Sequence, residues 1–190
     1  MTMRISKEPE ERKQEILETA MRLFSVNGFE KTSISDIAKE IGVAQGLCYR
    51  YFPSKDVLFQ SAISEYADNL INKMLESINV KNDTLCAIID KMKILVEDNE
   101  DVYYHSFHGE LNDNFHKLLT VTICEKLFPI VSSIIERANF NQEIHIANED
   151  IETYASFCVY GQLGILLNTD YSVQEKNNRI KIFLKELFKL

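Results

Sequence analysis

The chain has 190 residues, of which 45% are hydrophobic and 26% charged, and its formal net charge at pH 7 is −8. These values are typical of a globular protein with one large or two small domains. Residues 1–20 are charged and lack the apolar segment of a secretory signal, and the longest apolar-rich run, residues 154–167, is shorter than the roughly 20 residues of a membrane-spanning helix, so we expect a cytoplasmic protein.

The first 60 residues are predicted to contain three short helices and the start of a longer one. Apolar residues within residues 10–26 recur with the spacing of one helical face, and Gly28 suits the left-handed conformation that often follows a helix. Ser33 and Asp36 have the spacing of a capping box at the start of a second helix, which Gly42 would end.

A third helix is predicted over residues 45–52, directly after that glycine. Two short helices joined by a three- or four-residue turn that contains glycine are typical of a helix-turn-helix, whose second helix enters the major groove of DNA. Either Leu47 or Cys48, and either Tyr51 or Phe52, would face the interior. The pattern predicts that this part of the chain reads DNA.

The rest of the chain keeps the helical period, with no strand-like alternation longer than four residues. A helix from residue 55 to about residue 78 is long enough to join two domains. Pro129 is expected to kink one of the helices beyond it. Those further helices are predicted over residues 84–97, 101–110, 111–138, 149–168 and 173–190. The predicted fold class is all-α.

Charge and cysteine content limit the partners and the chemistry. Residues 1–60 hold nine basic and nine acidic residues, whereas residues 61–190 hold 12 and 20, so contact with nucleic acid must depend on a few local cations. The four cysteines lie far apart and form no CxxC pair, which predicts free thiols in a reducing compartment. No catalytic sequence motif is present, so we expect no enzymatic activity and no cofactor.

A dense set of residues between about 11 and 59 shares one pattern of spacing: Ile16, Leu17, Ala20, Leu23, Phe24, Gly28, Phe29, Thr32, Ser33, Asp36, Ile37, Ala38, Gly42, Val43, Gly46, Leu47, Tyr49, Tyr51, Phe52, Ser54 and Lys55. This pattern resembles the TetR family of transcriptional regulators, although Ala44 stands where many members have Ser or Thr. The resemblance implies an all-α homodimer with a DNA-binding domain at residues 1–54 and a ligand-binding and dimerisation domain at residues 55–190.

Eight residues are the candidates for contact with double-stranded DNA. Gln45 can pair with adenine, Leu47 can touch a thymine methyl group, and Arg50 can contact either phosphate or guanine. Hydroxyl and ammonium groups at helix starts can hold phosphate. Tyr49 could instead pack against the first helix. The full set is Thr32, Ser33, Gln45, Gly46, Leu47, Tyr49, Arg50 and Lys55.

A cluster of aromatic and imidazole side chains is the candidate ligand pocket, since pockets are mostly apolar with a few polar groups. An ordinary helix with aromatic core contacts would show the same pattern. The cluster consists of Tyr103, Tyr104, His105, Phe107, His108, Phe115 and His116. No cysteine or carboxylate pair completes a tetrahedral ligand set beside these histidines, so we expect no metal.

The last two predicted helices carry the candidate dimer interface. Residues 154–167 are apolar nearly all round, and residues 180–188 carry an apolar stripe that a partner subunit could cover in a four-helix bundle. The candidates are Tyr154, Phe157, Gly161, Ile165, Ile180, Phe183, Leu184 and Leu187.

These features together predict a ligand-responsive transcriptional regulator, most simply a repressor that binds a palindromic operator as a dimer and is released by a small, largely apolar molecule. Two alternatives remain open: a helical regulator gated by a protein partner, and a small-molecule or lipid carrier with a vestigial DNA domain.

Overall fold

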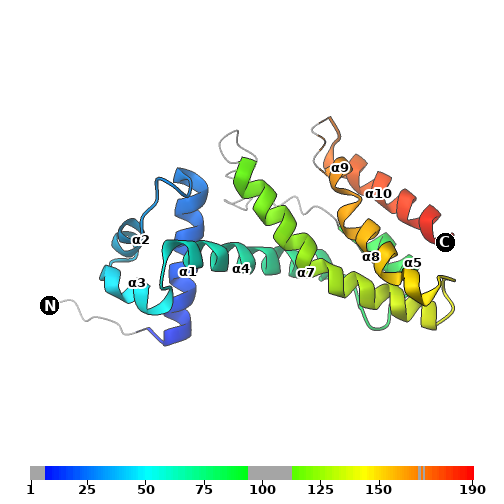
Figure 1. The fold of residues 1–190 in the computed structure, drawn as a ribbon, viewed down its shortest axis with the longest axis horizontal. Helices are drawn as coiled ribbons and strands as arrows, with labels where there is room; N and C mark the ends of the chain where they lie inside the picture. Colours follow the sequence, from blue (N-terminus) through cyan, green and yellow to red (C-terminus); the bar gives the residue numbers. More distant parts are fainter. Residues whose placement is uncertain (1–6, 94–112, 167, 169) are drawn as a thin grey trace. The chain divides into compact units, whose positions relative to one another are not determined.

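The protein is all-α, as the sequence predicts. The computed structural model describes residues 7–93, 113–166, 168 and 170–190, and every regular element in these ranges is a helix (Figure 1). The chain forms two compact units. Among the described residues, one comprises residues 7–66 with 113–119, and the other comprises residues 67–93 with those described from 120 to 190. We call them the N-terminal and C-terminal units.

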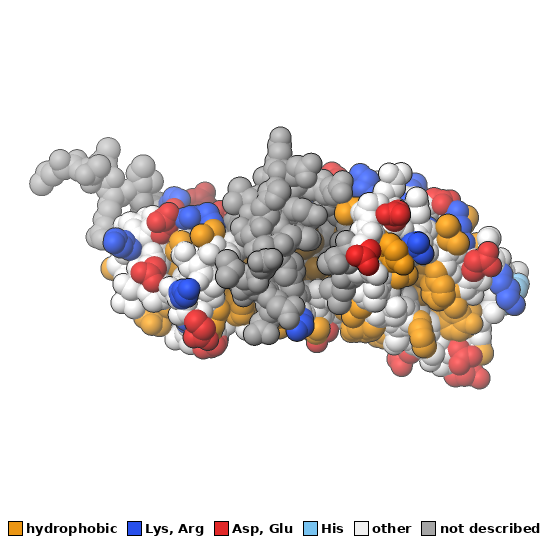
Figure 2. Space-filling view, turned by 90° about the horizontal axis from the view of Figure 1, so that it is seen from above, with side chains coloured by type: hydrophobic (Ala, Val, Ile, Leu, Met, Phe, Trp, Pro, Cys, Tyr) orange, Lys and Arg blue, Asp and Glu red, His pale blue; other side chains and the backbone are white. Residues whose placement is uncertain are grey.

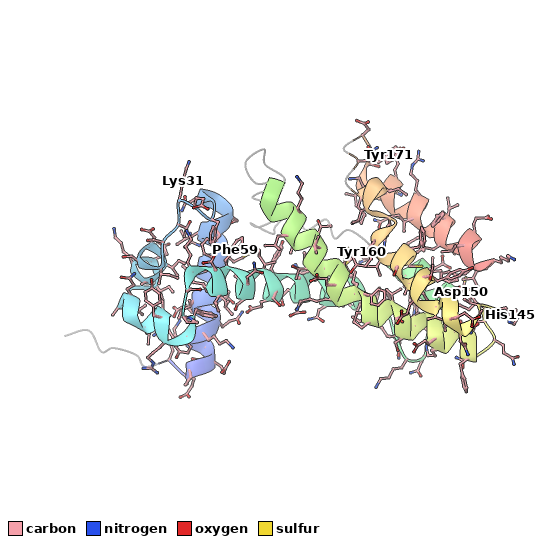
Figure 3. All side chains as sticks on the ribbon, in the orientation of Figure 1. Lys31, Phe59, His145, Asp150, Tyr160 and Tyr171 are labelled. Carbon is pink, nitrogen blue, oxygen red and sulfur yellow. The ribbon has the colours of Figure 1, made fainter. Side chains whose placement is uncertain are left out.

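The N-terminal unit is built from α1 (Pro9–Asn27), α2 (Ile34–Ile41), α3 (Gln45–Tyr51) and the first part of α4 (Lys55–Leu75). The apolar faces of these helices form one core, whose largest fully buried side chains include Ile16, Phe24, Ile37, Leu58 and Ile63. At its edge the Phe59 ring, labelled in Figure 3, packs edge-on against Phe24 with ring centroids 5.1 Å apart.

The helix ends of this unit follow local signals in the sequence. Ser33 and Asp36 form the expected capping box, in which the Ser33 side chain accepts from the Asp36 backbone N–H and the Asp36 carboxylate accepts from that of Ser33. The hydrogen bond from the Ser33 hydroxyl lowers the pKa of Asp36 below its ordinary value. Gly28 and Gly42 have φ of 82° and 74°, which favour glycine.

The C-terminal unit contains the rest of α4, α5 (Leu85–Lys91), most of α7 (Asp113–Phe140), a 3₁₀ turn at Asn148–Asp150, α8 (Ile151–Tyr160), α9 (Leu163–Leu166) and α10 (Val173–Phe188). Its core draws Ile88 from α5, Ile135 from α7, Ala155 from α8 and Ile180 from α10. Pro129 lies inside α7, which continues on both sides of it.

Two predicted helices have different bounds. The helix expected over residues 84–97 already ends at Lys91, because Met92 takes an extended conformation with φ −60° and ψ 134°. The helix expected over residues 149–168 is divided between α8 and α9, with a turn at Gly161. A Cβ atom on Gly161 would lie 2.6 Å from the Phe157 carbonyl oxygen, so this turn requires glycine. The helix expected over residues 101–110 lies outside the described residues.

The most apolar long helix is not the run at residues 154–167 but Lys117–Phe140, which has the length and composition of a membrane-crossing helix. Its residues Ile134, Ile135 and Ala138 are buried in the core of the C-terminal unit. Only 22% of the apolar window of this helix is buried, but a single helix of this length and composition does not by itself indicate a membrane protein.

Polar contacts hold α5 to the neighbouring elements of the C-terminal unit. At its start, the Glu143 carboxylate accepts from the Leu85 backbone N–H at 2.6 Å. Near its end, Asp90 pairs with Lys185 of α10 at 2.6 Å, and the hydrogen bond between them lowers the pKa of Asp90. Lys181 donates to the Asp90 carbonyl oxygen at 2.7 Å. These contacts join the end of α5 to α10, whereas its apolar side chains anchor it in the core of the unit.

Candidate nucleic-acid interface and C-terminal cavity

The exposed surface of α3 carries the side chains expected to contact DNA. Gln45, Gly46 and Arg50 are exposed, and Tyr49 is 46% exposed rather than packed under the first helix. Cys48 is fully buried. This short helix therefore buries the Cys48 side chain and exposes the Gln45 amide, the Tyr49 phenol and the Arg50 guanidinium group.

The sequence left open which residue of each pair, Leu47 or Cys48 and Tyr51 or Phe52, faces the interior, and burial decides both cases. Cys48 and Phe52 are buried at 0% and 2% exposure, whereas Leu47 and Tyr51 are half-buried. Burial raises the pKa of the Cys48 thiol, so it stays neutral at physiological pH. Leu47 therefore keeps part of its surface available beside Gln45.

Thr32 differs from its expected role at the phosphate backbone. Its side chain is only 1% exposed, and its hydroxyl donates to the carbonyl oxygens of Gly28, at 2.9 Å, and Leu23, at 3.1 Å. Its backbone N–H donates to the Phe29 carbonyl oxygen at 3.3 Å. Thr32 therefore fastens the loop after α1 to the end of that helix and has no side-chain surface to offer DNA.

Ser33 and Lys55 are also engaged within the unit. The Ser33 hydroxyl donates to the Asp36 carboxylate at 2.6 Å as part of the capping box. The Lys55 ammonium donates to the Phe29 carbonyl oxygen at 2.8 Å and lies 4.0 Å from the centroid of the Phe29 ring. Lys55 thus joins the start of α4 to the loop before α2, while its half-buried side chain keeps some exposed surface.

A partly open cavity with a volume of about 110 Å³ lies in the C-terminal unit. Its walls come from α4, α5, α7, α8 and α10, and they are almost entirely aliphatic. Representative lining residues are Met74, Ile88, Ile134, Ile135, Cys158 and Leu184. Burial raises the pKa of the Cys158 thiol to about 12, so this lining group is uncharged at neutral pH.

Gln162 supplies an amide to the wall of the cavity, just beyond the end of α8. Its Nε2 donates to the Cys158 carbonyl oxygen at 2.5 Å, one of the last carbonyl groups of the helix, which lack partners within the helix. Its Oε1 is buried and accepts no hydrogen bond from the described residues.

The residues expected to line a ligand pocket cannot be compared with this cavity. Tyr103, Tyr104, His105, Phe107 and His108 lie outside the described residues. Phe115 and His116 lie in α7, but their side chains are also outside the description.

The structure divides the expected dimer residues into two groups. Phe157 and Phe183 are 61% and 53% exposed, and Gly161 is exposed. Ile180 and Leu184, in contrast, are 1% and 6% exposed because they face the core of their own unit. Tyr154, Ile165 and Leu187 are half-buried against the same core. Ile180 and Leu184 are therefore core residues rather than interface residues.

The outward apolar surface includes two side chains that the sequence pattern did not single out. Ile182 is 64% exposed and Tyr160, labelled on α8 in Figure 3, is 39% exposed. We refer to these two residues together with Phe157 and Phe183, the exposed large apolar side chains of α8 and α10, as the outer apolar patch. The patch spans α8 and α10, two helices that are in contact through Tyr154 and Phe188. Figure 2 shows hydrophobic side chains among charged ones on the exposed surface of this unit.

Sequence reasoning also missed the cavity and Gln162. The aliphatic lining residues follow the helical period, as all core residues do, so no local signal separates a cavity wall from a filled core. Gln162 carries a weak signal: it is the one amide side chain in an otherwise apolar or small run from residue 155 to residue 167.

A glycine-containing turn between α2 and α3, with polar side chains exposed along α3, defines a helix-turn-helix DNA-binding protein. Residues 16–62 match the model of the bacterial regulatory proteins of the tetR family. The chain is 28% identical over 185 residues to the uncharacterized HTH-type transcriptional regulator YvdT of Bacillus subtilis (strain 168), covering 92% of this chain and 90% of that protein.

Two further comparisons agree with this match. The chain is 39% identical over 74 residues to the uncharacterized HTH-type transcriptional regulator YuxN of the same organism, which covers 39% of this chain but only 25% of YuxN. The structure of Salmonella enterica GusR has the same fold, with a TM-score of 0.68, 21% identity, and coverage of 97% of this chain and 98% of that chain. Residues 16–62 therefore match the TetR family of transcriptional regulators, and the chain as a whole is similar in sequence to an HTH-type regulator and in fold to GusR.

The buried position of Thr32 can be tested with two substitutions. Thr32→Val keeps the shape of the side chain but removes its hydrogen bonds, so we expect the free energy of unfolding to fall by about 1–3 kcal/mol. Thr32→Ser keeps the hydroxyl and should lose only about 1 kcal/mol for the missing methyl group. Both variants, once folded, should bind DNA as the wild type does. A stable Thr32→Val protein with weakened DNA binding would contradict the structural role.

Proposed function

We infer that the protein is a cytoplasmic, ligand-responsive transcriptional repressor. In this proposal it binds a palindromic operator as a homodimer and releases it when a small, largely apolar molecule occupies the C-terminal cavity. The proposal rests on the observation that one helix, α4, contributes to both units. It supplies Leu58 and Ile63 to the core of the N-terminal unit, and it supplies Met74 and Leu75 to the cavity wall.

The contact with DNA is proposed to come chiefly from α3. Gln45 and Tyr49 are four residues apart and therefore share one face of the helix, and Arg50 is exposed beside them. Gln45 would read a base edge, while Tyr49 and Arg50 would hold the backbone. Ser33 and Lys55 contribute less in this proposal, because internal hydrogen bonds already engage them.

The proposed dimer interface is the outer apolar patch. Four large apolar or aromatic side chains of one unit are exposed on two adjacent helices, and two copies of such a pair would form a four-helix bundle. Leu187, which packs against the core of its own unit, is a poorer test site than Phe183, because its replacement would also damage that core.

The effector is proposed to act through α4. A molecule that fills the cavity contacts Met74 and Leu75 at one end of the helix, while Lys55 and Leu58 at the other end pack beside the DNA-reading helices. A ligand shifts DNA binding only if it prefers one arrangement of α4 over another, and the coupling acts equally in both directions.

Substitutions on α3 test the DNA contact. Selection from random duplexes should return inverted repeats whose half-sites lie about 34–36 Å apart or near a multiple of that spacing. Gln45→Ala should reduce the discrimination at one base pair by about 1–3 kcal/mol. Arg50→Ala should weaken DNA binding and lower the slope of log K against log salt concentration by about 1. Gln174→Ala and Arg179→Ala, on exposed positions of α10, are matched controls that should change neither. If the α3 variants behave like these controls, α3 does not read DNA.

Analytical ultracentrifugation of a charged variant tests the dimer. Phe183→Glu would place a carboxylate without a partner in the buried interface, which is costly, so the variant should sediment as a monomer. Phe140→Glu is the matched control, since Phe140 is 88% exposed at the end of α7 and its variant should remain dimeric. A dimeric Phe183→Glu protein would place the interface elsewhere.

Induction is tested with a ligand identified by thermal-shift screening. Its affinity for the protein is measured in the presence and in the absence of operator DNA. We expect the operator to weaken ligand binding by a factor that corresponds to about 1–3 kcal/mol. Val131→Phe, which adds a ring to the cavity wall, should abolish ligand binding and leave operator binding intact. Equal ligand affinities for the free and operator-bound protein would exclude release by this ligand.

A further inference from the structure

The amide of Gln162 makes the cavity chemically specific, because it is the main polar feature of an otherwise aliphatic wall. Among the described lining residues, the other charged or hydrogen-bonding side chains are the exposed Lys93 and the neutral thiol of Cys158. A charged group buried among aliphatic side chains without a partner loses its hydration and gains nothing in return. The part of a ligand that lies against the aliphatic wall, away from Lys93, is therefore uncharged.

The orientation of the Gln162 amide follows from its partner. The Cys158 carbonyl oxygen can only accept, so the Nε2 group must face it at 2.5 Å. Exchanging the two amide positions would bring two acceptor oxygens together. Consequently Oε1, and not the NH₂ group, is the atom left without a hydrogen bond from the described residues.

A buried acceptor without a donor is unfavourable, and a ligand that brings a donor recovers that free energy. The Oε1 atom has less than 1 Å² of accessible surface, so a donor reaches it only when nearby side chains shift. Two of the lining residues are Met74 and Met92, whose unbranched side chains with three rotatable bonds adapt readily to such a change.

The size of the cavity limits the body of the ligand. Its volume is about 110 Å³, compared with an engineered apolar cavity of about 150 Å³ that binds benzene. A single ring or a short branched alkyl group fills such a space. We propose that the ligand class of this cavity is a small, uncharged apolar molecule with one hydroxyl or amide donor, and that the donor binds the Gln162 Oε1 atom.

This inference rests on the proposed function for its biological meaning, since it names the effector class of the same cavity. Its test, however, uses the free full-length protein without DNA. The probes are phenol and toluene, which have nearly the same shape but differ in the donor, together with benzoate as the anionic counterpart. Binding is followed by NMR of ¹³C-methyl methionine, assigned by single Met→Leu variants.

Phenol should shift the Met74 and Met92 methyl signals, while the signal of Met21, buried in the N-terminal unit, should stay unchanged. The ratio of the toluene and phenol dissociation constants should fall roughly tenfold in Gln162→Met, equivalent to about 1.4 kcal/mol. The difference in hydration between phenol and toluene is the same for the wild type and for Gln162→Met. The change in the ratio therefore isolates the contact with residue 162. Gln174→Met on exposed α10 makes the same chemical change outside the cavity and should leave the ratio unchanged.

Three results would overturn the proposal. An unchanged ratio in Gln162→Met would remove the donor contact, a larger response to benzoate than to phenol would exclude the uncharged class, and an absence of shifts at Met74 and Met92 with all three probes would exclude the cavity. If Gln162→Met does not fold, Gln162→Leu provides the same comparison. Any of these results would leave the proposals on operator binding and dimerisation unaffected. If phenol instead binds through Gln162 but does not release operator, only the induction mechanism is contradicted.

Discussion

The backbone hydrogen bonds of α4 run without interruption from Lys55 to Leu75, and the side chains of this helix belong to two different cores. Leu58 is fully buried beside α1 in the N-terminal unit, whereas Ile71 is 5% exposed in the C-terminal unit. A helix of this kind is stiff along its axis, since bending it strains successive hydrogen bonds. The same helix therefore contributes side chains to the core of each unit.

The N-terminal unit separates the residues that hold the fold from those left free for recognition. Phe29 is the centre of the holding set: its carbonyl oxygen accepts from Lys55, and its ring packs on Phe24 and Phe59. Thr32 closes the same loop from within. These side chains are engaged in the loop, whereas the amide, phenol and guanidinium groups of α3 remain exposed. A rigid loop behind a short helix is what a reader of base edges requires.

Local chemistry made much of the N-terminal unit predictable. The capping box at Ser33 and the positive φ of Gly42 involve only neighbouring residues, and both are confirmed. Burial of Thr32 was not predictable, because its hydroxyl partners come from the end of α1. On α10 the helical period correctly groups Ile180, Phe183 and Leu184 on one broad side, but it does not tell which edge the chain's own core covers. The cavity has no sequence signal, since five separate helices must meet to form it.

The shortness of α5 makes it depend on its tertiary contacts. A seven-residue helix is not stable on its own, and its ion pairs, Lys91 with Asp83 and Asp90 with Lys185, are partly exposed and therefore contribute little. Its apolar side chains hold it in place as one wall of the cavity. α5 therefore stays helical only while the core of the C-terminal unit holds it, so any loosening of that core would also unfold one wall of the cavity.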